Sequence, residues 1–108
     1  MVHERLVSIS QDHPSIAGHF PGHPIVPGVV LLNEVLDTLR RGSPAPLVVK
    51  GLPSVKFSSP LRPGEVVTIR VDEDTVALAT FSCQVDERII ASGTIEFTPG
   101  TALRAEQG

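Results

Sequence analysis

The chain has 108 residues and a mass of 11.5 kDa, which is enough for one domain and too little for two. Hydrophobic residues make up 41% and charged residues 19%, a balance typical of a globular chain rather than a disordered one. A net charge of −3 without a basic cluster argues against nucleic acid as the main partner, and the single cysteine excludes an intrachain disulfide and a zinc site built from cysteines. The sequence shows no signal-peptide pattern and no apolar run near the roughly 20 residues of a membrane span, so we expect a cytoplasmic protein.

The first half of the chain predicts one strand, a proline-rich segment and one helix. The strand is expected over residues 3–9, and prolines and glycines then exclude regular structure up to the helix. The helix is predicted over residues 28–40, because Pro27 suits a helix start and Gly42 is a typical helix stop. Its apolar residues include an unbroken row at 29–32, which predicts a helix buried on most of its sides.

The second half of the chain predicts four strands. They cover residues 47–57, 65–72, 75–85 and 88–97, with an interruption at Pro53. Alternation places two sets of residues each on one face of a strand: Val67, Ile69 and Val71, and then Ile89, Ala91, Gly93, Ile95 and Phe97. The order of elements predicts an α+β domain over residues 1–98, in which an antiparallel sheet packs on one helix, followed by a flexible tail at 99–108.

Candidate chemistry is concentrated just before the predicted helix. His19 lies in a segment that Pro21, Pro24 and Pro27 make rigid, and the segment leads directly into Gly28. The N–H of Gly28 is unpaired within the first helical turn and lies at the positive end of the helix dipole. A histidine base and such a donor together suit proton abstraction next to a carbonyl group. The alternative is a turn that contains a structural histidine.

The segment from His19 to Val29 resembles the signature of the FabA/FabZ-type β-hydroxyacyl-ACP dehydratases. That signature reads His-Phe-x-Gly-x-Pro-x-(hydrophobic)-Pro-Gly-(hydrophobic), and here it is His-Phe-Pro-Gly-His-Pro-Ile-Val-Pro-Gly-Val. Residues 56–65, with Lys-Phe, a proline and Arg-Pro-Gly-Glu, and the strand ending at Phe97 extend the resemblance over about residues 3–98. It implies the hotdog fold, a curved antiparallel sheet wrapped around one long central helix. The chain is most similar to the compact FabA-like or ApeI-like dehydratases of secondary pathways such as aryl polyene synthesis.

The resemblance also implies a reaction, the dehydration of a 3-hydroxyacyl thioester to a trans-2-enoyl thioester. The substrate would be carried by acyl carrier protein or coenzyme A. His19 would take the α-proton, and the Gly28 N–H would hold the thioester oxygen. No cofactor and no metal are implied, because phosphopantetheine arrives with the substrate. Five further residues are expected to contact the substrate: Phe20, Pro21, Gly22, Val26 and Val29.

One position departs from the family pattern. The family has Glu or Asp fourteen residues after the motif histidine, and this chain has Asn33 there. Asparagine cannot titrate and therefore cannot act as a general acid, but it can donate a hydrogen bond to the departing hydroxyl. Glu34 is adjacent, although it points about 100° away around the helix. Two alternatives stay open: a hotdog thioesterase, because the implied fold hosts both activities, and a non-catalytic helper subunit, because the expected carboxylate is replaced by Asn33.

Partners are expected on both the protein and the substrate side. The family forms its site across two chains, so we expect a homodimer, a higher oligomer, or a heterodimer with another hotdog protein that supplies a carboxylate. An acidic carrier protein would dock on basic residues, and the candidates are Arg40, Arg41, Arg62 and Lys56. The alternative for these four residues is ordinary solvated surface charge.

Overall fold

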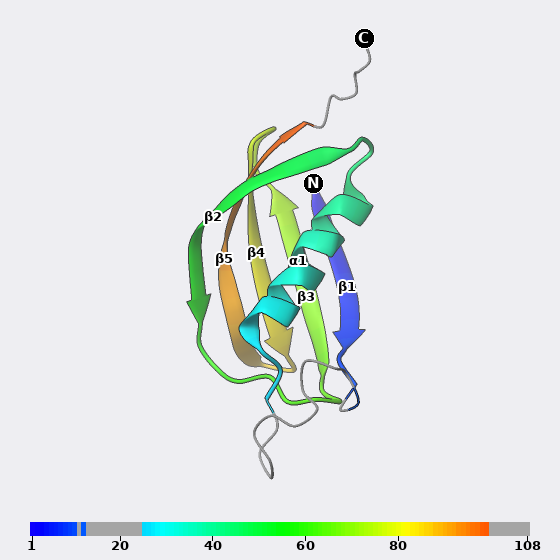
Figure 1. Ribbon diagram of the computed structural model, residues 1–108, viewed down its shortest axis with the longest axis vertical. Helices are drawn as coiled ribbons and strands as arrows, with labels where there is room; N and C mark the ends of the chain where they lie inside the picture. Colours follow the sequence, from blue (N-terminus) through cyan, green and yellow to red (C-terminus); the bar gives the residue numbers. More distant parts are fainter. Residues whose placement is uncertain (11, 13–24, 100–108) are drawn as a thin grey trace.

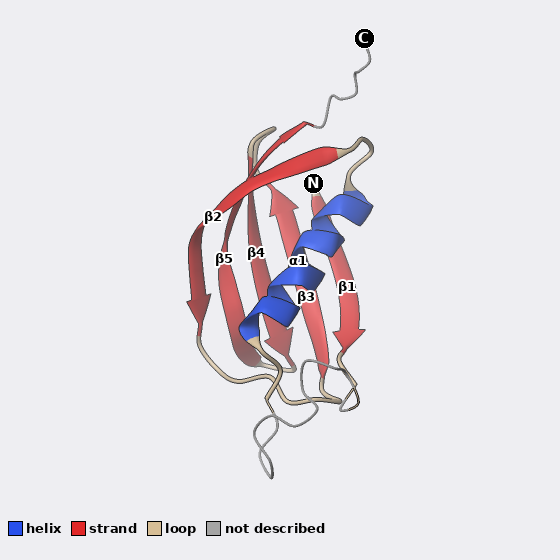
Figure 2. Cartoon of the chain, in the orientation of Figure 1, coloured by secondary structure: helices blue, strands red, loops and turns tan. Residues whose placement is uncertain are grey.

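One curved sheet and one helix make up the computed structural model, which describes residues 1–10, 12 and 25–99. The elements in chain order are β1 (Val2–Ser8), α1 (Gly28–Gly42), β2 (Leu47–Phe57), β3 (Val66–Glu73), β4 (Leu78–Val85) and β5 (Arg88–Pro99). The strands form a single sheet in the order β1-β3-β4-β5-β2, and every neighbouring pair is antiparallel. Figure 1 and Figure 2 show this sheet curving around α1. The predicted α+β arrangement is confirmed. The predicted tail at 99–108 is described only at Pro99, which ends β5, and residues 100–108 lie outside the described residues.

The helix begins and ends where the sequence predicts, within two residues. Pro27 precedes the first turn in an extended conformation, with φ −59° and ψ 142°, and its carbonyl accepts the N–H of Val30 at 3.0 Å. Arg40 and Arg41 lie in the last turn, where their charge complements the negative end of the helix dipole. The predicted burial on most sides is wrong for the single chain. Residues buried on α1 follow one face only, and Val29 on another face is 64% exposed.

The core lies between α1 and the concave face of the sheet. The prediction for β3 is confirmed, since Val67, Ile69 and Val71 are fully buried. The prediction for β5 is wrong at Ile89, which is 42% exposed, while Ile90 is buried. The cause is a β-bulge, because Cys83 pairs with Ala91 and Gln84 pairs with Ile89, which leaves Ile90 as an extra residue. The extra residue shifts the alternation of side chains by one position.

Strand β2 lies at one edge of the sheet and pairs irregularly with β5. Its register shifts twice, between Val49 and Gly51 and between Gly51 and Ser54, and the second shift includes Pro53. Here β2 approaches β5 so closely that a Cβ atom on Gly93 would lie 2.1 Å from the Ser54 carbonyl oxygen. Glycine is therefore required at position 93 by the packing of two backbones. Within the described residues, no helix has the length and hydropathy that a membrane span requires.

Candidate active site

A mainly apolar cavity of about 450 Å³ lies at the N-terminal end of α1. One side is formed by the start of the helix, with Ile25, Val26, Gly28 and Leu31. The opposite side is formed by Phe57 at the end of β2, by residues 58–61, which we call the wall segment, and by Ile90. The cavity therefore brings together the end of the histidine motif and the region of Lys56–Glu65, the two parts of the sequence that carry the family resemblance.

Gly28 is in the wall of the cavity, in close contact with Phe57. A Cβ atom at position 28 would lie 2.7 Å from Cζ of the Phe57 ring, which is closer than side chains pack. Among the described residues, the Gly28 N–H has no backbone acceptor, as expected in the first turn of a helix. The position thus offers an N–H donor at the positive end of a helix dipole beside an apolar cavity.

Backbone hydrogen bonds hold the opposite side of the cavity in place. The N–H groups of Ser58 and Ser59 donate to the Ile90 carbonyl oxygen, at 2.8 and 3.4 Å. The Val26 N–H donates to the Leu61 carbonyl oxygen at 2.8 Å and so joins the wall segment to the residues before the helix. Ile90, the extra residue of the bulge, therefore contributes to the cavity in two ways: it lines the cavity, and its carbonyl oxygen accepts the hydrogen bonds that hold the wall segment.

The predicted site residues separate into three groups. His19, Phe20, Pro21 and Gly22 lie outside the described residues. Val26 and Gly28 line the cavity. Val29 and Asn33, which are four residues apart on the helix, are exposed and do not line the cavity of their own chain. The structure thus brings Gly28 and Val26 together but directs Asn33 away from them.

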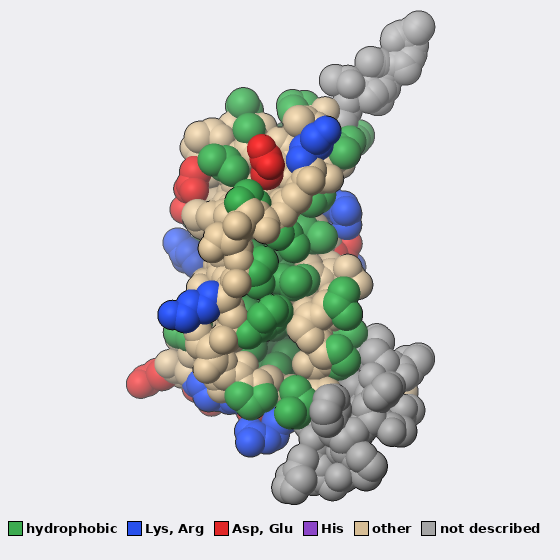
Figure 3. All heavy atoms as spheres, turned by 60° about the vertical axis from the view of Figure 1, so that its left-hand side comes forward, with side chains coloured by type: hydrophobic (Ala, Val, Ile, Leu, Met, Phe, Trp, Pro, Cys, Tyr) green, Lys and Arg blue, Asp and Glu red, His purple; other side chains and the backbone are tan. Residues whose placement is uncertain are grey.

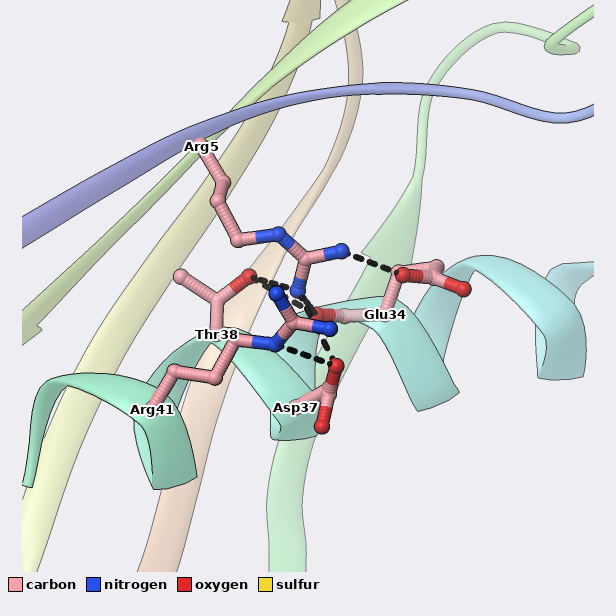
Figure 4. A network of polar contacts seen from close by, with 5 residues as sticks. All are labelled: Arg5, Glu34, Asp37, Thr38 and Arg41. Carbon is pink, nitrogen blue, oxygen red and sulfur yellow. Dashed lines mark hydrogen bonds and ion pairs between the residues drawn. The ribbon is translucent and has the colours of Figure 1, made fainter.

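Glu34 is engaged in a polar network and does not replace Asn33. Figure 4 shows Arg5 of β1 reaching across to α1, where Nη2 donates to Oε1 of Glu34 at 2.7 Å. Nη1 of Arg5 also donates to the hydroxyl of Thr38 at 3.2 Å and to Asp37 at 3.3 Å. Asp37 accepts a further hydrogen bond from Arg41, the expected partner one helical turn away. This network holds the carboxylates of Glu34 and Asp37 on the side of α1 that faces β1.

The four candidate docking residues do not form one patch. Lys56 is next to Phe57, and Arg62 directly follows the wall segment, so both flank the cavity in the sequence. Arg40 and Arg41 are at the other end of α1, about 18 Å from Gly28 along the helix axis. Arg41 is in addition paired with Asp37.

A second polar network, which the sequence analysis does not predict, lies beside the wall segment. Arg88, the first residue of β5, donates to the hydroxyl of Ser59, to the carbonyl of Pro60 and to the carboxylate of Glu65. The Arg62 backbone N–H, and then the Arg88 guanidinium, lower the pKa of Glu65 below its ordinary value. Glu65 and Arg88 are 23 positions apart in the chain, so no local sequence pattern could pair them.

The remaining titratable candidates have structural roles. His3 is mostly buried, with its Nε2 2.6 Å from Oε2 of Glu73 and its ring against Gly42. Cys83 is fully buried, and burial raises the pKa of its thiol to about 12. In the part of the chain that the structure describes, no three His, Cys, Asp or Glu side chains lie close enough together to hold a metal ion.

An open apolar face runs along the molecule between β2 and the helix. Figure 3 shows hydrophobic side chains gathered in this hollow, next to the edge strand β2. Partly buried residues from both elements contribute to it, namely Leu32 and Leu36 from α1 and Leu47, Val49, Leu52 and Val55 from β2. The face continues past Phe57, which is 50% exposed, to the cavity at the helix start. The described residues of a single chain leave this face uncovered.

Comparison with protein families gives one match that covers most of the chain. The model of the ApeI-like family, described as ApeI dehydratase, matches residues 3–94. Among curated proteins, the 3-hydroxyacyl-[acyl-carrier-protein] dehydratase FabZ of Streptococcus uberis is 28% identical over 91% of this chain and 86% of its own length. FabZ of Streptococcus pyogenes serotype M3 is also 28% identical, over 90% and 86%.

Solved structures share the same architecture. The dehydratase heterocomplex ApeI:P from Xenorhabdus doucetiae superposes with a TM-score of 0.77 at 24% identity, over 89% of this chain and 88% of that chain. The fluoroacetyl-CoA thioesterase FlK superposes with a TM-score of 0.70 at 12% identity, over 91% and 84%. These likenesses confirm the hotdog fold that the sequence resemblance implies.

Proposed function

The chain belongs to the ApeI-like dehydratase family, and we propose that it removes water from a 3-hydroxyacyl thioester and leaves a trans-2-enoyl thioester. The FabZ relatives, which carry out this dehydration on acyl carrier protein thioesters, align with nearly the whole chain. The observation that carries the proposal is the apolar cavity with Gly28 in its wall. Such a cavity can hold an acyl chain while the helix N-terminus takes the thioester carbonyl.

The first step follows from the chemistry at Gly28. Removal of the α-proton moves negative charge onto the thioester oxygen, and an N–H at a helix N-terminus stabilises that charge. His19 is the base that we assign to this step, and it precedes Ile25 of the cavity wall in the same motif. The α C–H electron pair forms the new double bond as the oxygen at the β-carbon leaves.

The leaving hydroxyl needs a proton to depart as water, and Asn33 cannot supply one at neutral pH. The imidazolium of His19, formed in the first step, can return the α-proton to the hydroxyl on the same side of the substrate. The proton taken from the α-carbon then leaves with the hydroxyl as water, and no second acid is needed. The Asn33 amide donates a hydrogen bond that orients the hydroxyl, which is the role left to it by its lack of a titrating proton.

Asn33 reaches a site only in an assembly of two chains. In its own chain it is exposed and absent from the cavity wall, on the same helix face as the exposed Val29. The open apolar face and the unpaired edge of β2 are the surfaces that a second copy would cover. We therefore propose a homodimer in which Asn33 of one chain approaches the cavity of the other.

Acyl carrier protein is the partner that we propose to deliver the substrate, in the cytoplasm. Carrier proteins are acidic, and the basic residues Lys56 and Arg62 are the sequence neighbours of Phe57 and Leu61 in the cavity wall. Arg40 and Arg41 are too far along α1 to belong to the same docking surface. Charge reversal at Lys56 is thus expected to weaken turnover of carrier-linked substrate more than charge reversal at Arg40.

The experiment that tests the function is turnover of a short 3-hydroxyacyl thioester by the purified protein. Enoyl formation is followed by its absorbance and thioester hydrolysis by release of free thiol. The protein's own Cys83 adds little background to the thiol assay, because it is fully buried. The His19→Ala variant is expected to lose turnover by at least about 100-fold, the usual contribution of a positioned base.

Other outcomes distinguish the two alternatives. Thiol release without enoyl product would identify a thioesterase, a reading that the FlK likeness does not favour because it shows the fold alone. Absence of both products from a folded dimer would favour a helper subunit, and the lost carboxylate at Asn33 is the observation behind that alternative. Asn33→Asp then tests the helper alternative, since an acid restored at this position raises turnover if the native site is impaired and lowers turnover if Asn33 is itself the working residue.

A further inference from the structure

Arg88 is the residue that connects the start of β5 to the wall of the cavity. Its guanidinium Nη1 donates to the Ser59 hydroxyl at 3.0 Å and to the Pro60 carbonyl at 2.8 Å. Its Nη2 donates to Oε2 of Glu65 at 2.5 Å. Ser59 and Pro60 both line the cavity, so the Arg88 side chain holds two residues of the wall segment. No other described side chain makes hydrogen bonds to this segment.

Glu65 makes this anchor rigid. Its Oε1 accepts the backbone N–H of Arg62 at 2.8 Å, while Oε2 accepts Arg88. The turn between them is closed by the Glu65 N–H, which donates to the Arg62 carbonyl at 3.2 Å, and by Gly64 with φ +88°. The carboxylate therefore fixes the turn and the guanidinium at the same time, and these contacts lower its pKa.

The wall segment is hydrogen-bonded to the residues just before the helix. The Leu61 carbonyl accepts the Val26 N–H at 2.8 Å, and both residues are almost fully buried. Val26 is joined through Pro27, whose φ is restricted by its ring, to Gly28. A shift of Pro60 and Leu61 would thus move the backbone that carries the Gly28 N–H.

We propose that Arg88 is a positioning residue for the dehydration, because it sets the wall segment and, through Leu61 and Val26, the place of the Gly28 N–H. The proposal rests on the function proposed above. A purely structural role would show mainly in stability, yet the Arg88 side chain is 34% exposed, and ion pairs that solvent reaches contribute little to stability. The effect of Arg88 is therefore expected in catalysis, where a misplacement of about 1 Å can cost about 100-fold.

The test compares Arg88→Met with a matched control, Arg70→Met. Arg70 forms an exposed ion pair with Glu4 between β3 and β1, away from the cavity, and so controls for the loss of a surface charge pair. We expect kcat of Arg88→Met to fall at least about 10-fold with little change in KM, while Arg70→Met keeps wild-type kcat. Arg88→Lys, which restores the charge but not the fork of donors, is expected to recover only part of kcat.

A second measurement keeps the test independent of activity. Hydrogen exchange of the Val26 amide reports the bond to Leu61 directly, and it should become at least about 10-fold faster in Arg88→Met and stay unchanged in Arg70→Met. If the wild-type protein makes no enoyl product, the proposed function fails, while the exchange of Val26 still tests the role of Arg88. Wild-type kcat together with wild-type Val26 exchange in Arg88→Met would overturn the proposal, as would equal losses in Arg70→Met.

Discussion

Substitution of Gly28 by alanine tests the contact between the helix start and Phe57. The added Cβ would lie 2.7 Å from the ring Cζ and 3.1 Å from Cε1, whereas carbon atoms pack at about 3.5–4.0 Å. The ring must therefore move by about 1 Å. Because Phe57 is 50% exposed, the ring can move outward, and the cost stays at the low end of the about 1–3 kcal/mol typical of overpacking. The higher helix propensity of alanine offsets up to about 1 kcal/mol of this cost.

The expected result for Gly28→Ala is a folded protein with a damaged site. The free energy of unfolding, measured by denaturant titration, should change by less than about 1 kcal/mol. The value of kcat/KM for enoyl formation should fall by about 10-fold to 100-fold, because the Phe57 ring in the cavity wall is displaced by about 1 Å. The matched control is Gly51→Ala in β2, where a Cβ meets nothing within 4 Å, and it should leave both quantities unchanged.

A double-mutant cycle identifies the cause of the loss. Phe57→Leu shortens the side chain that the new Cβ would meet, so the Gly28→Ala substitution should cost less in the Phe57→Leu background than in the wild type. A folded Gly28→Ala variant with wild-type kcat/KM would refute the reasoning. Equal losses in both backgrounds would show that the effect does not pass through Phe57.

Three further predictions concern stability and reactivity. Gly93→Ala should lower the free energy of unfolding by at least about 1–3 kcal/mol in a denaturant titration, because the new Cβ meets the Ser54 backbone oxygen, which cannot move away as a side chain can. An unchanged free energy of unfolding would contradict the close approach of β2 to β5. Glu65→Gln should be less stable than the wild type at neutral pH, and the difference in stability should shrink as the pH falls below about 4.5. The reason is that a carboxyl whose pKa is lowered by folding stabilises the fold only while it is ionised. A difference in thermal unfolding that does not change with pH would count against this. Alkylation of Cys83 at pH 8 should proceed only as fast as the protein unfolds, because burial raises its pKa to about 12, and rapid labelling of the native protein would show an accessible thiol.

Local sequence patterns predicted most of the fold. The helix start at Gly28 followed from Pro27, and the buried face of β3 followed from the alternation at Val67, Ile69 and Val71. Such patterns are set by the period of a helix or a strand, which acts over a few neighbouring residues. The histidine motif likewise indicated the family, because its residues are consecutive in the chain.

Predictions failed where a contact depends on a distant partner. Ile89 and Ile90 are equally suited to a buried strand position, and only the pairing of Cys83 with Ala91 decides that Ile90 faces the cavity. The apolar row at 29–32 was expected to be covered on most sides, but a single chain of this size leaves Val29 exposed. Burial is a property of the assembled molecule, so composition of one element could not predict it.

The sequence by itself determined the order and type of the elements, the α+β class and the family, because these depend on short-range periodicity and on a contiguous motif. Only the tertiary structure decided which face of α1 is open, that Arg5 engages Glu34, and that Arg88 supports the cavity wall. These pairs join residues 28 or more positions apart. Their contacts follow from strand register and from the way the sheet curves around the helix, which no local pattern in the chain encodes.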